Sequence, residues 1–143
     1  MDHVAIMKKS WGLIPRILSG AKTIESRWYM TRRKPWDSLQ EGEWIYFKNS
    51  GEPVTAKTRV KKVIQYADLS PKKVVWLLKK YGRQDGLPPS EIPRYYEQFK
   101  HKKYCMMIFL GKPLKSKPFE IEKRGFGAMA AWITVEDIKS ISI

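Results

Sequence analysis

Three charged residues of mixed sign stand within six positions of the segment GAKTIESRWY, which covers residues 20–29. Glu25 and Arg27 are two positions apart, so in a strand their side chains point to the same face. Lys22 precedes them, at the bend that follows a predicted helix. In a concave site the two cations would keep Glu25 ionised, and its carboxylate could accept hydrogen bonds from the exocyclic amine of a nucleobase. Lys22 and Arg27 could hold a phosphate, which arginine binds with two parallel hydrogen bonds.

The same three side chains also fit a structural role, as an ion-pair network that holds the helix against the sheet. Charged residues in strands usually form a solvated face, and clustered charges mark sites only as a tendency. The sequence leaves both roles open for Lys22 and Glu25. For Arg27 it favours a structural pairing with Glu25.

The balance of charges indicates a polyanionic partner. The 143 residues include 28 lysines and arginines against 14 aspartates and glutamates, which gives a formal net charge of +14. An excess of this size destabilises a folded chain by self-repulsion. Binding to nucleic-acid phosphates is the main prediction, and a lysine-rich surface that only keeps the protein soluble is the alternative. Lys79 and Lys80 fit that alternative, as the outer face of a helix.

Hydrophobic periodicity and turn residues predict the order of the elements. Strands are expected at residues 3–7, 23–30, 44–48, 54–66 (long and bent) and 104–111. Ser10 and Gly20 are expected to bound a first helix. Ser70 caps a second helix that ends at Gly82, and a third helix begins after Ser90.

This order does not sustain a β-α-β alternation, so it predicts an α+β fold. We expect a single domain over residues 1–143, built as a small mixed, mostly antiparallel β-barrel with helices packed outside. Cys105 is the only cysteine, which excludes an internal disulfide. No metal site and no cofactor are predicted, because the two histidines are far apart. Neither a transmembrane run nor a signal peptide is found, so we expect a cytoplasmic protein without a membrane partner.

The pattern Gly20-x-Lys22-x-x-Glu25-x-Arg27, placed between a short helix and a strand, resembles the signature of the ASCH domain. The later segment EGEWIYFKNSGEPVTAKTRVKKV is similar to the family's glycine turn, aromatic strand and basic strand. The resemblance implies a PUA-like β-barrel with the charged residues gathered in a cleft between the sheet and a helix. It also implies RNA or a modified nucleoside as the partner.

One branch of that family hydrolyses the amide of N4-acylated cytidine, with the motif lysine, a threonine three positions later and a more distant carboxylate. Lys22 matches, but Glu25 stands where the threonine would be, and Asp68 is the nearest counterpart of the carboxylate. We therefore expect nucleic-acid binding first. The alternative is a hydrolase of a modified nucleoside, or a ribonuclease, with Lys22 and Glu25 as catalytic residues. A small-ligand regulator is a third class.

Trp36 lies in the basic loop TRRKPW and is the candidate for stacking on a splayed nucleobase. Trp44 and Trp132 are expected to be core residues. The complete set of predicted nucleic-acid contacts is Lys22, Glu25, Arg27, Arg32, Arg33, Trp36, Lys48, Lys57 and Arg59.

Overall fold

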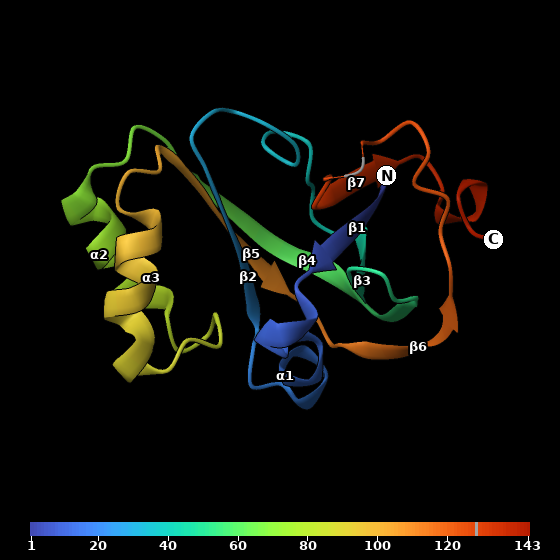
Figure 1. Ribbon diagram of the computed structural model, residues 1–143, viewed down its shortest axis with the longest axis horizontal. Helices are drawn as coiled ribbons and strands as arrows, with labels where there is room; N and C mark the ends of the chain where they lie inside the picture. The colour runs from blue at the N-terminus through green and yellow to red at the C-terminus, as the bar shows by residue number, and fades with distance from the viewer. Residues whose placement is uncertain (128) are drawn as a thin grey trace.

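Seven strands and three α-helices form the computed structural model, which describes residues 1–127 and 129–143 (Figure 1). The strands are β1 (Asp2–Met7), β2 (Ile24–Tyr29), β3 (Trp44–Asn49), β4 (Val54–Tyr66), β5 (Tyr104–Leu110), β6 (Leu114–Phe119) and β7 (Trp132–Val135). The helices are α1 (Leu13–Ser19), α2 (Pro71–Tyr81) and α3 (Ile92–Phe99), and short 3-10 turns form at Lys9–Trp11, Pro89–Glu91 and Ile138–Ser140. The predicted α+β class is confirmed.

The strands follow the order β2-β5-β4-β3-β1-β7 across the sheet, and β6 pairs with the first half of β4. The pairing of β1 with β3 is parallel, and the other pairings are antiparallel. Within the described residues, β2 and β7 end the sheet and do not pair with each other. The sheet is therefore open, and the predicted closed barrel is not confirmed.

β4 is the longest strand and joins the two halves of the sheet. Its first half alternates buried residues (Val54, Ala56 and Thr58) with more exposed ones, as expected of a half-buried strand. The register shifts between Val60 and Lys62, near the point where β4 passes from pairing with β3 to pairing with β5. An extra residue at such a bulge bends a strand, which agrees with the long bent strand predicted.

Two helices cover the end of the sheet formed by β2 and β5. α2 and α3 lie side by side there (Figure 1), and Val74, Leu77 and Leu78 of α2 are buried against the sheet. Ser70 caps α2 as predicted, because its side chain accepts a hydrogen bond from the Lys73 N–H over 3.2 Å. None of the helices in the described part of the chain combines the length and apolar character that a membrane crossing requires.

α1 packs Ile14 and Ile17 into a second core, which is formed by residues of β1, β3, β4 and β5 and by Trp132. The predicted helix cap at Ser10 is wrong, because residues 9–11 form a 3-10 turn and Gly12, with φ 61°, directly precedes α1. Gly20 ends α1 as predicted. It adopts φ 85°, a conformation that favours glycine, and its N–H donates to the Ile17 oxygen over 3.1 Å.

Candidate functional site

The signature segment lies at the junction of α1, β2 and the turn that follows α2. The Lys22 N–H donates to the Arg16 oxygen over 2.9 Å. The Thr23 and Ile24 N–H groups both donate to the Gln84 oxygen, over 2.8 and 3.0 Å. These bonds tie the bend before β2 to the turn after α2, and they bring the Lys22 side chain against that turn.

Lys22 is paired with a carboxylate from the same turn. Its Nζ donates to Asp85 Oδ1 over 2.6 Å and to the Asp85 backbone oxygen over 2.7 Å. The Ser26 hydroxyl donates to the second carboxylate oxygen, Oδ2, over 2.6 Å. Lys22 and Asp85 are each only 3% exposed, so this network is shielded from bulk water.

Burial and opposite charge together set the protonation of this pair. Burial opposes the charge on Lys22, but the Glu25 and Asp85 carboxylates outweigh it, so the pKa of Lys22 is raised. Burial raises the pKa of Asp85, while the Lys22 ammonium and the Ser26 hydroxyl oppose that rise. Lys22 is therefore held as a cation at neutral pH.

Glu25 and Arg27 lie next to this network and keep hydrogen-bonding capacity to spare. Glu25 Oε2 is 3.8 Å from Lys22 Nζ, and Glu25 Oε1 is 3.5 Å from Arg27 Nε. Both contacts are ion pairs, but neither has hydrogen-bond geometry. Glu25 Oε2 and Arg27 Nε are buried and have no hydrogen-bond partner among the described residues. An acceptor and a donor thus stand side by side, unsatisfied by the protein itself.

A cleft made of three adjoining cavities opens in front of these side chains. The innermost cavity, of about 60 Å³, is lined by the Lys22 network. It shares Glu25 and Phe99 with the middle cavity of about 270 Å³. The outer cavity, of about 710 Å³, shares Tyr29 and Lys102 with the middle one. The charged cluster therefore forms the inner end of the cleft.

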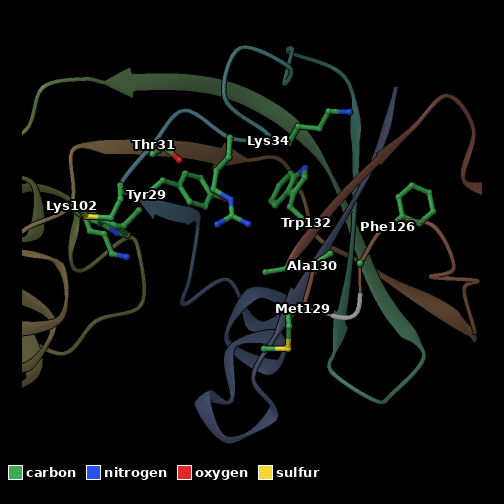
Figure 2. Close-up of a pocket in the computed structure, with 13 residues that line it drawn as sticks. Tyr29, Thr31, Lys34, Lys102, Phe126, Met129, Ala130 and Trp132 are labelled. Atoms are coloured by element: carbon green, nitrogen blue, oxygen red, sulfur yellow. The ribbon is translucent and has the colours of Figure 1, made fainter.

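Aromatic side chains from separate elements form the walls of the outer cavity. Figure 2 shows Tyr29 and Lys102 on one side of it, and Trp132 and Phe126 on the other. The guanidinium carbon of Arg27 lies 5.1 Å from the centre of the Trp132 ring. Trp132 is 8% exposed, so it serves both the core, as predicted, and the wall of the cleft. Such flat rings can hold a nucleobase by stacking.

Basic side chains stand along the mouth of the cleft. Arg33, Lys34 and Lys102 line the outer cavity, and Arg33 and Lys34 are exposed. Arg32 instead lies over the Tyr104 ring, with its guanidinium carbon 5.6 Å from the ring centre, and it does not line the cavity. Exposed cations at the mouth of an aromatic cleft suit the phosphates of a nucleotide chain.

Besides Arg32, four further predicted contact residues lie outside the cleft. Trp36 is half-buried, with its ring edge-on to a tyrosine of β5 at 5.2 Å. Lys57 and Arg59 flank Trp44 on the surface of β3 and β4, at 4.7 and 4.3 Å from the centre of its ring. Lys48 is only 5% exposed within β3. None of the four lines the three cavities.

The sequence does not predict several residues that complete the cleft. Asp85, and not Asp68, is the carboxylate paired with Lys22. Trp11 is 45% exposed and lines the two inner cavities, while Lys102 borders the outer two. The only sequence signal for Asp85 is the dipeptide Asp85-Gly86, which indicates a turn but not what that turn contacts.

The described residues contain no group of three or more histidine, cysteine, aspartate or glutamate side chains that could share a metal ion. Glu25 and Asp85 come closest to an acidic cluster. Both face the Lys22 ammonium, which occupies the position between them.

No protein-family model and no curated protein matches the sequence. Solved structures match the fold. The ASCH protein of Zymomonas mobilis superimposes with a TM-score of 0.67 at 18% identity, over 99% of this chain and 96% of that chain. A point variant of that protein gives a TM-score of 0.68 at 18% identity, over 97% and 93% of the two chains.

A protein of Enterococcus faecalis V583 is also similar, with a TM-score of 0.53 at 13% identity over 78% of this chain and 76% of that chain. The Zymomonas mobilis structures cover nearly the whole length of the chain, including the signature segment between α1 and β2. The chain therefore has the fold of these ASCH structures, as the signature segment predicts.

Proposed function

We propose that the chain binds single-stranded RNA or a modified nucleoside in this cleft, with one nucleobase seated against Glu25. The observation that carries the proposal is the pair of buried, unsatisfied atoms, Glu25 Oε2 and Arg27 Nε. Buried polar groups cost free energy unless a partner completes their hydrogen bonds. The ASCH fold supports the proposal, because the resemblance implies the same class of partner.

The two unsatisfied atoms require a donor and an acceptor that are adjacent on the ligand. Glu25 Oε2 requires a donor, and the Nε–H of Arg27 requires an acceptor. Cytosine and adenine present an exocyclic amino group beside an unprotonated ring nitrogen, and uracil presents an N–H beside a carbonyl, so each of these bases supplies both groups. The pair is therefore complementary to the hydrogen-bonding edge of a nucleobase.

The rest of the cleft suits the sugar, the phosphate and the flat faces of the base. Tyr29 and Trp132 offer rings on the two sides of the outer cavity. Arg33, Lys34 and Lys102 provide positive charge at its mouth. Phosphate contacts position a strand, and base contacts select it, so the two sets of residues have separate roles.

Titration with cytidine monophosphate tests the base contact. Glu25→Gln keeps the shape of the side chain but removes the carboxylate charge. We expect it to weaken cytidine monophosphate binding by about 1 kcal/mol, because the amide oxygen accepts a neutral hydrogen bond in place of a charge-assisted one. Glu136→Gln, at an exposed position outside the cleft lining, is the matched control. Equal affinity of the wild type and of Glu25→Gln for cytidine monophosphate would contradict the proposal.

A second candidate function is hydrolysis of an N-acylated nucleoside, and one contact favours it. Ser26 Oγ donates to Asp85 Oδ2 over 2.6 Å beside the two inner cavities, and a hydroxyl paired with a carboxylate can act as a nucleophile. In this scheme Ser26 attacks the amide carbonyl and its proton passes through Asp85 to the departing amine. Water then releases the acyl group as a carboxylic acid. Lys22 is not the general base here, because its Nζ is a protonated donor to Asp85.

Product analysis with an N4-acylated cytidine separates the two candidates. A hydrolase releases cytidine and the free acid, and Ser26→Ala abolishes that release while the nucleoside still binds. A binding protein forms a complex and no product. The first outcome would replace binding with hydrolysis as the function of the cleft.

A further inference from the structure

We propose that the outer face of α2 carries a second contact for single-stranded nucleic acid, where Trp76 and the lysines around it form a stacking platform. This inference rests on the proposed function in one respect, namely that nucleic acid is the ligand. It uses none of the residues that line the cleft. It accounts for a part of the positive charge that the cleft leaves unused.

Trp76 is exposed where the amphipathic pattern of α2 requires a polar residue. Val74, Leu77 and Leu78 of the same helix are at most 1% exposed and pack against the sheet, whereas Trp76 is 43% exposed. A single exposed aliphatic residue is common, but a large exposed aromatic ring set among like charges indicates an interaction surface.

All charged residues of α2, the helix that carries Trp76, are lysines. Lys73 Nζ lies 3.8 Å and Lys80 Nζ 4.6 Å from the centre of the Trp76 ring. Lys72 and Lys73 line a hollow of about 300 Å³ beside the ring. α2 contains four lysines and no acidic residue. The sequence suggests a merely solvated role for Lys80, but the structure places its ammonium against an aromatic face.

A second ring extends this surface towards the sheet. Tyr66, near the end of β4, lies edge-on to Trp76 with the ring centres 6.5 Å apart. Lys73 Nζ is also 5.5 Å from the centre of the Tyr66 ring, so one ammonium serves both rings. Neighbouring rings with cations between them are typical of proteins that stack successive bases of a single strand.

The lysines that cover the Trp76 ring do not prevent stacking. An exposed cation–π contact is weaker than the stacking of a nucleobase on an aromatic ring, so a base can displace the ammonium. The displaced lysine then remains close enough to pair with the phosphate of the same nucleotide. An acidic peptide would satisfy Lys72 and Lys80 but offers no flat surface for Trp76, so nucleic acid fits better.

The position of α2 also fits a strand that extends beyond the cleft. Figure 1 shows α2 beside α3 at one end of the molecule, and Phe99 of α3 lines the two inner cavities. A strand seated in the cleft can therefore pass over α3 to reach α2. A mononucleotide can occupy the cleft without reaching α2.

Fluorescence anisotropy with an unstructured RNA of about 20 nucleotides, compared with cytidine monophosphate, tests this inference. We expect Trp76→Ala to weaken binding of the long RNA by about 5- to 100-fold and to leave the mononucleotide unaffected. Trp76→Phe retains a ring and is expected to restore most of the affinity. Glu25→Gln, by contrast, weakens binding of both ligands.

Charge-matched variants provide the control. Lys72→Ala/Lys80→Ala should weaken long-RNA binding more than Lys117→Ala/Lys139→Ala, which removes two exposed lysines elsewhere. Unchanged long-RNA affinity in a folded Trp76→Ala variant overturns the inference. The inference is also overturned if Trp76→Ala weakens binding of a polyglutamate peptide but not of RNA. That result would assign the surface to an acidic protein. If the mononucleotide fails to bind but long-RNA affinity still depends on Trp76, the cleft proposal fails and this inference stands.

Discussion

Lys22 is held between two buried carboxylates, and its removal leaves Asp85 without a counter-ion, while Glu25 keeps its pairing with Arg27. We expect Lys22→Met to lower the free energy of unfolding by about 3–5 kcal/mol, because Asp85 then carries an uncompensated charge in the interior. Urea denaturation followed by tryptophan fluorescence measures this loss.

Two further variants test that explanation. Lys22→Met/Asp85→Asn removes the second charge as well and is expected to recover part of the loss. Lys9→Met breaks a surface ion pair with Glu52, in which Lys9 is 73% exposed, and is expected to change stability very little. The explanation fails if Lys22→Met unfolds at the same urea concentration as Lys9→Met.

His3 is fully buried and fixes Trp132, one wall of the cleft. The Trp132 Nε1–H donates to His3 Nδ1 over 3.2 Å, and His3 Nε2 lies 2.9 Å from Glu43 Oε1. Because an indole N–H can only donate, the proton of neutral His3 is on Nε2. Protonation of Nδ1 would set two N–H groups against each other, so neutral His3 is the form that positions Trp132.

A pH dependence of stability follows from this arrangement. Burial lowers the pKa of His3 below its ordinary value of 6.5, despite the opposing effect of Glu43. The unfolded chain therefore binds a proton first, so the contribution is complete above about pH 6.5 and is lost as the pH falls. We expect a slope of at most about 1.4 kcal/mol per pH unit in urea denaturation below that pH.

The matched pair of histidines isolates this effect. His3→Gln is expected to flatten the dependence of the free energy of unfolding on pH between about 7 and 5. His101→Gln changes an exposed histidine and is expected to preserve it. Identical slopes in the two variants would rule out His3 as the source.

At the level of residues, the sequence predicts which motif side chains lie together, but it does not predict which distant residues pair with them. Glu25 and Arg27 share a face as predicted because strand alternation is a local rule, and Lys22 joins them from the bend before β2. Asp85 lies 63 positions from Lys22, and no periodicity or turn signal reports a contact over that separation. The basic neighbours of Trp36 predict a stacking role, but they carry no information about the packing of its ring against β5.

Among the elements, the turn after α2 is the part that holds Lys22 in place. Gly86 adopts φ 79°, and a Cβ atom added there would lie 3.3 Å from Lys22 Cβ. We expect Gly86→Ala to lower the free energy of unfolding by about 1–2 kcal/mol through its backbone alone, and further through contact with Lys22. Nucleotide affinity should fall as well, because Lys22 adjoins Glu25. Urea denaturation and nucleotide titration measure the two effects.

Gly51 provides the comparison for this variant. It has φ 76° in the turn between β3 and β4, and a Cβ atom there would meet no atom within 4 Å. Gly51→Ala therefore carries the same backbone cost without the contact to Lys22. If Gly51→Ala and Gly86→Ala have equal effects on stability and on nucleotide affinity, the contact with Lys22 has no role.

The elements themselves are the most predictable part of the fold. Strand alternation, the Ser70 cap and the glycine after α1 each act over a few residues, so the sequence reveals them directly. The start of α1 is less predictable, because Ser10 has the composition of a cap but lies within a 3-10 turn. Closure of the sheet depends on which strands meet at its ends, which no local pattern determines.

For the molecule as a whole, the net charge of +14 predicts a marked dependence of RNA affinity on salt. For an oligonucleotide short enough to fill only the cleft, phosphate contacts to Arg33, Lys34 and Lys102 predict a slope of about −2 in a plot of log K against log salt. Lys34→Ala is expected to make that slope shallower by about 0.7, and Lys139→Ala to leave it unchanged. Affinity that is independent of salt would exclude phosphate contacts at the mouth of the cleft.

β4 runs without interruption from one half of the sheet to the other, so the two halves share a single backbone. Halves joined in this way cannot swing apart about a hinge, as separately folded lobes do. Under the proposed function, an incoming base therefore enters a preformed slot, and little reorganisation of the protein is required. Association is expected to occur in a single kinetic phase, with no slow closing step after the first encounter.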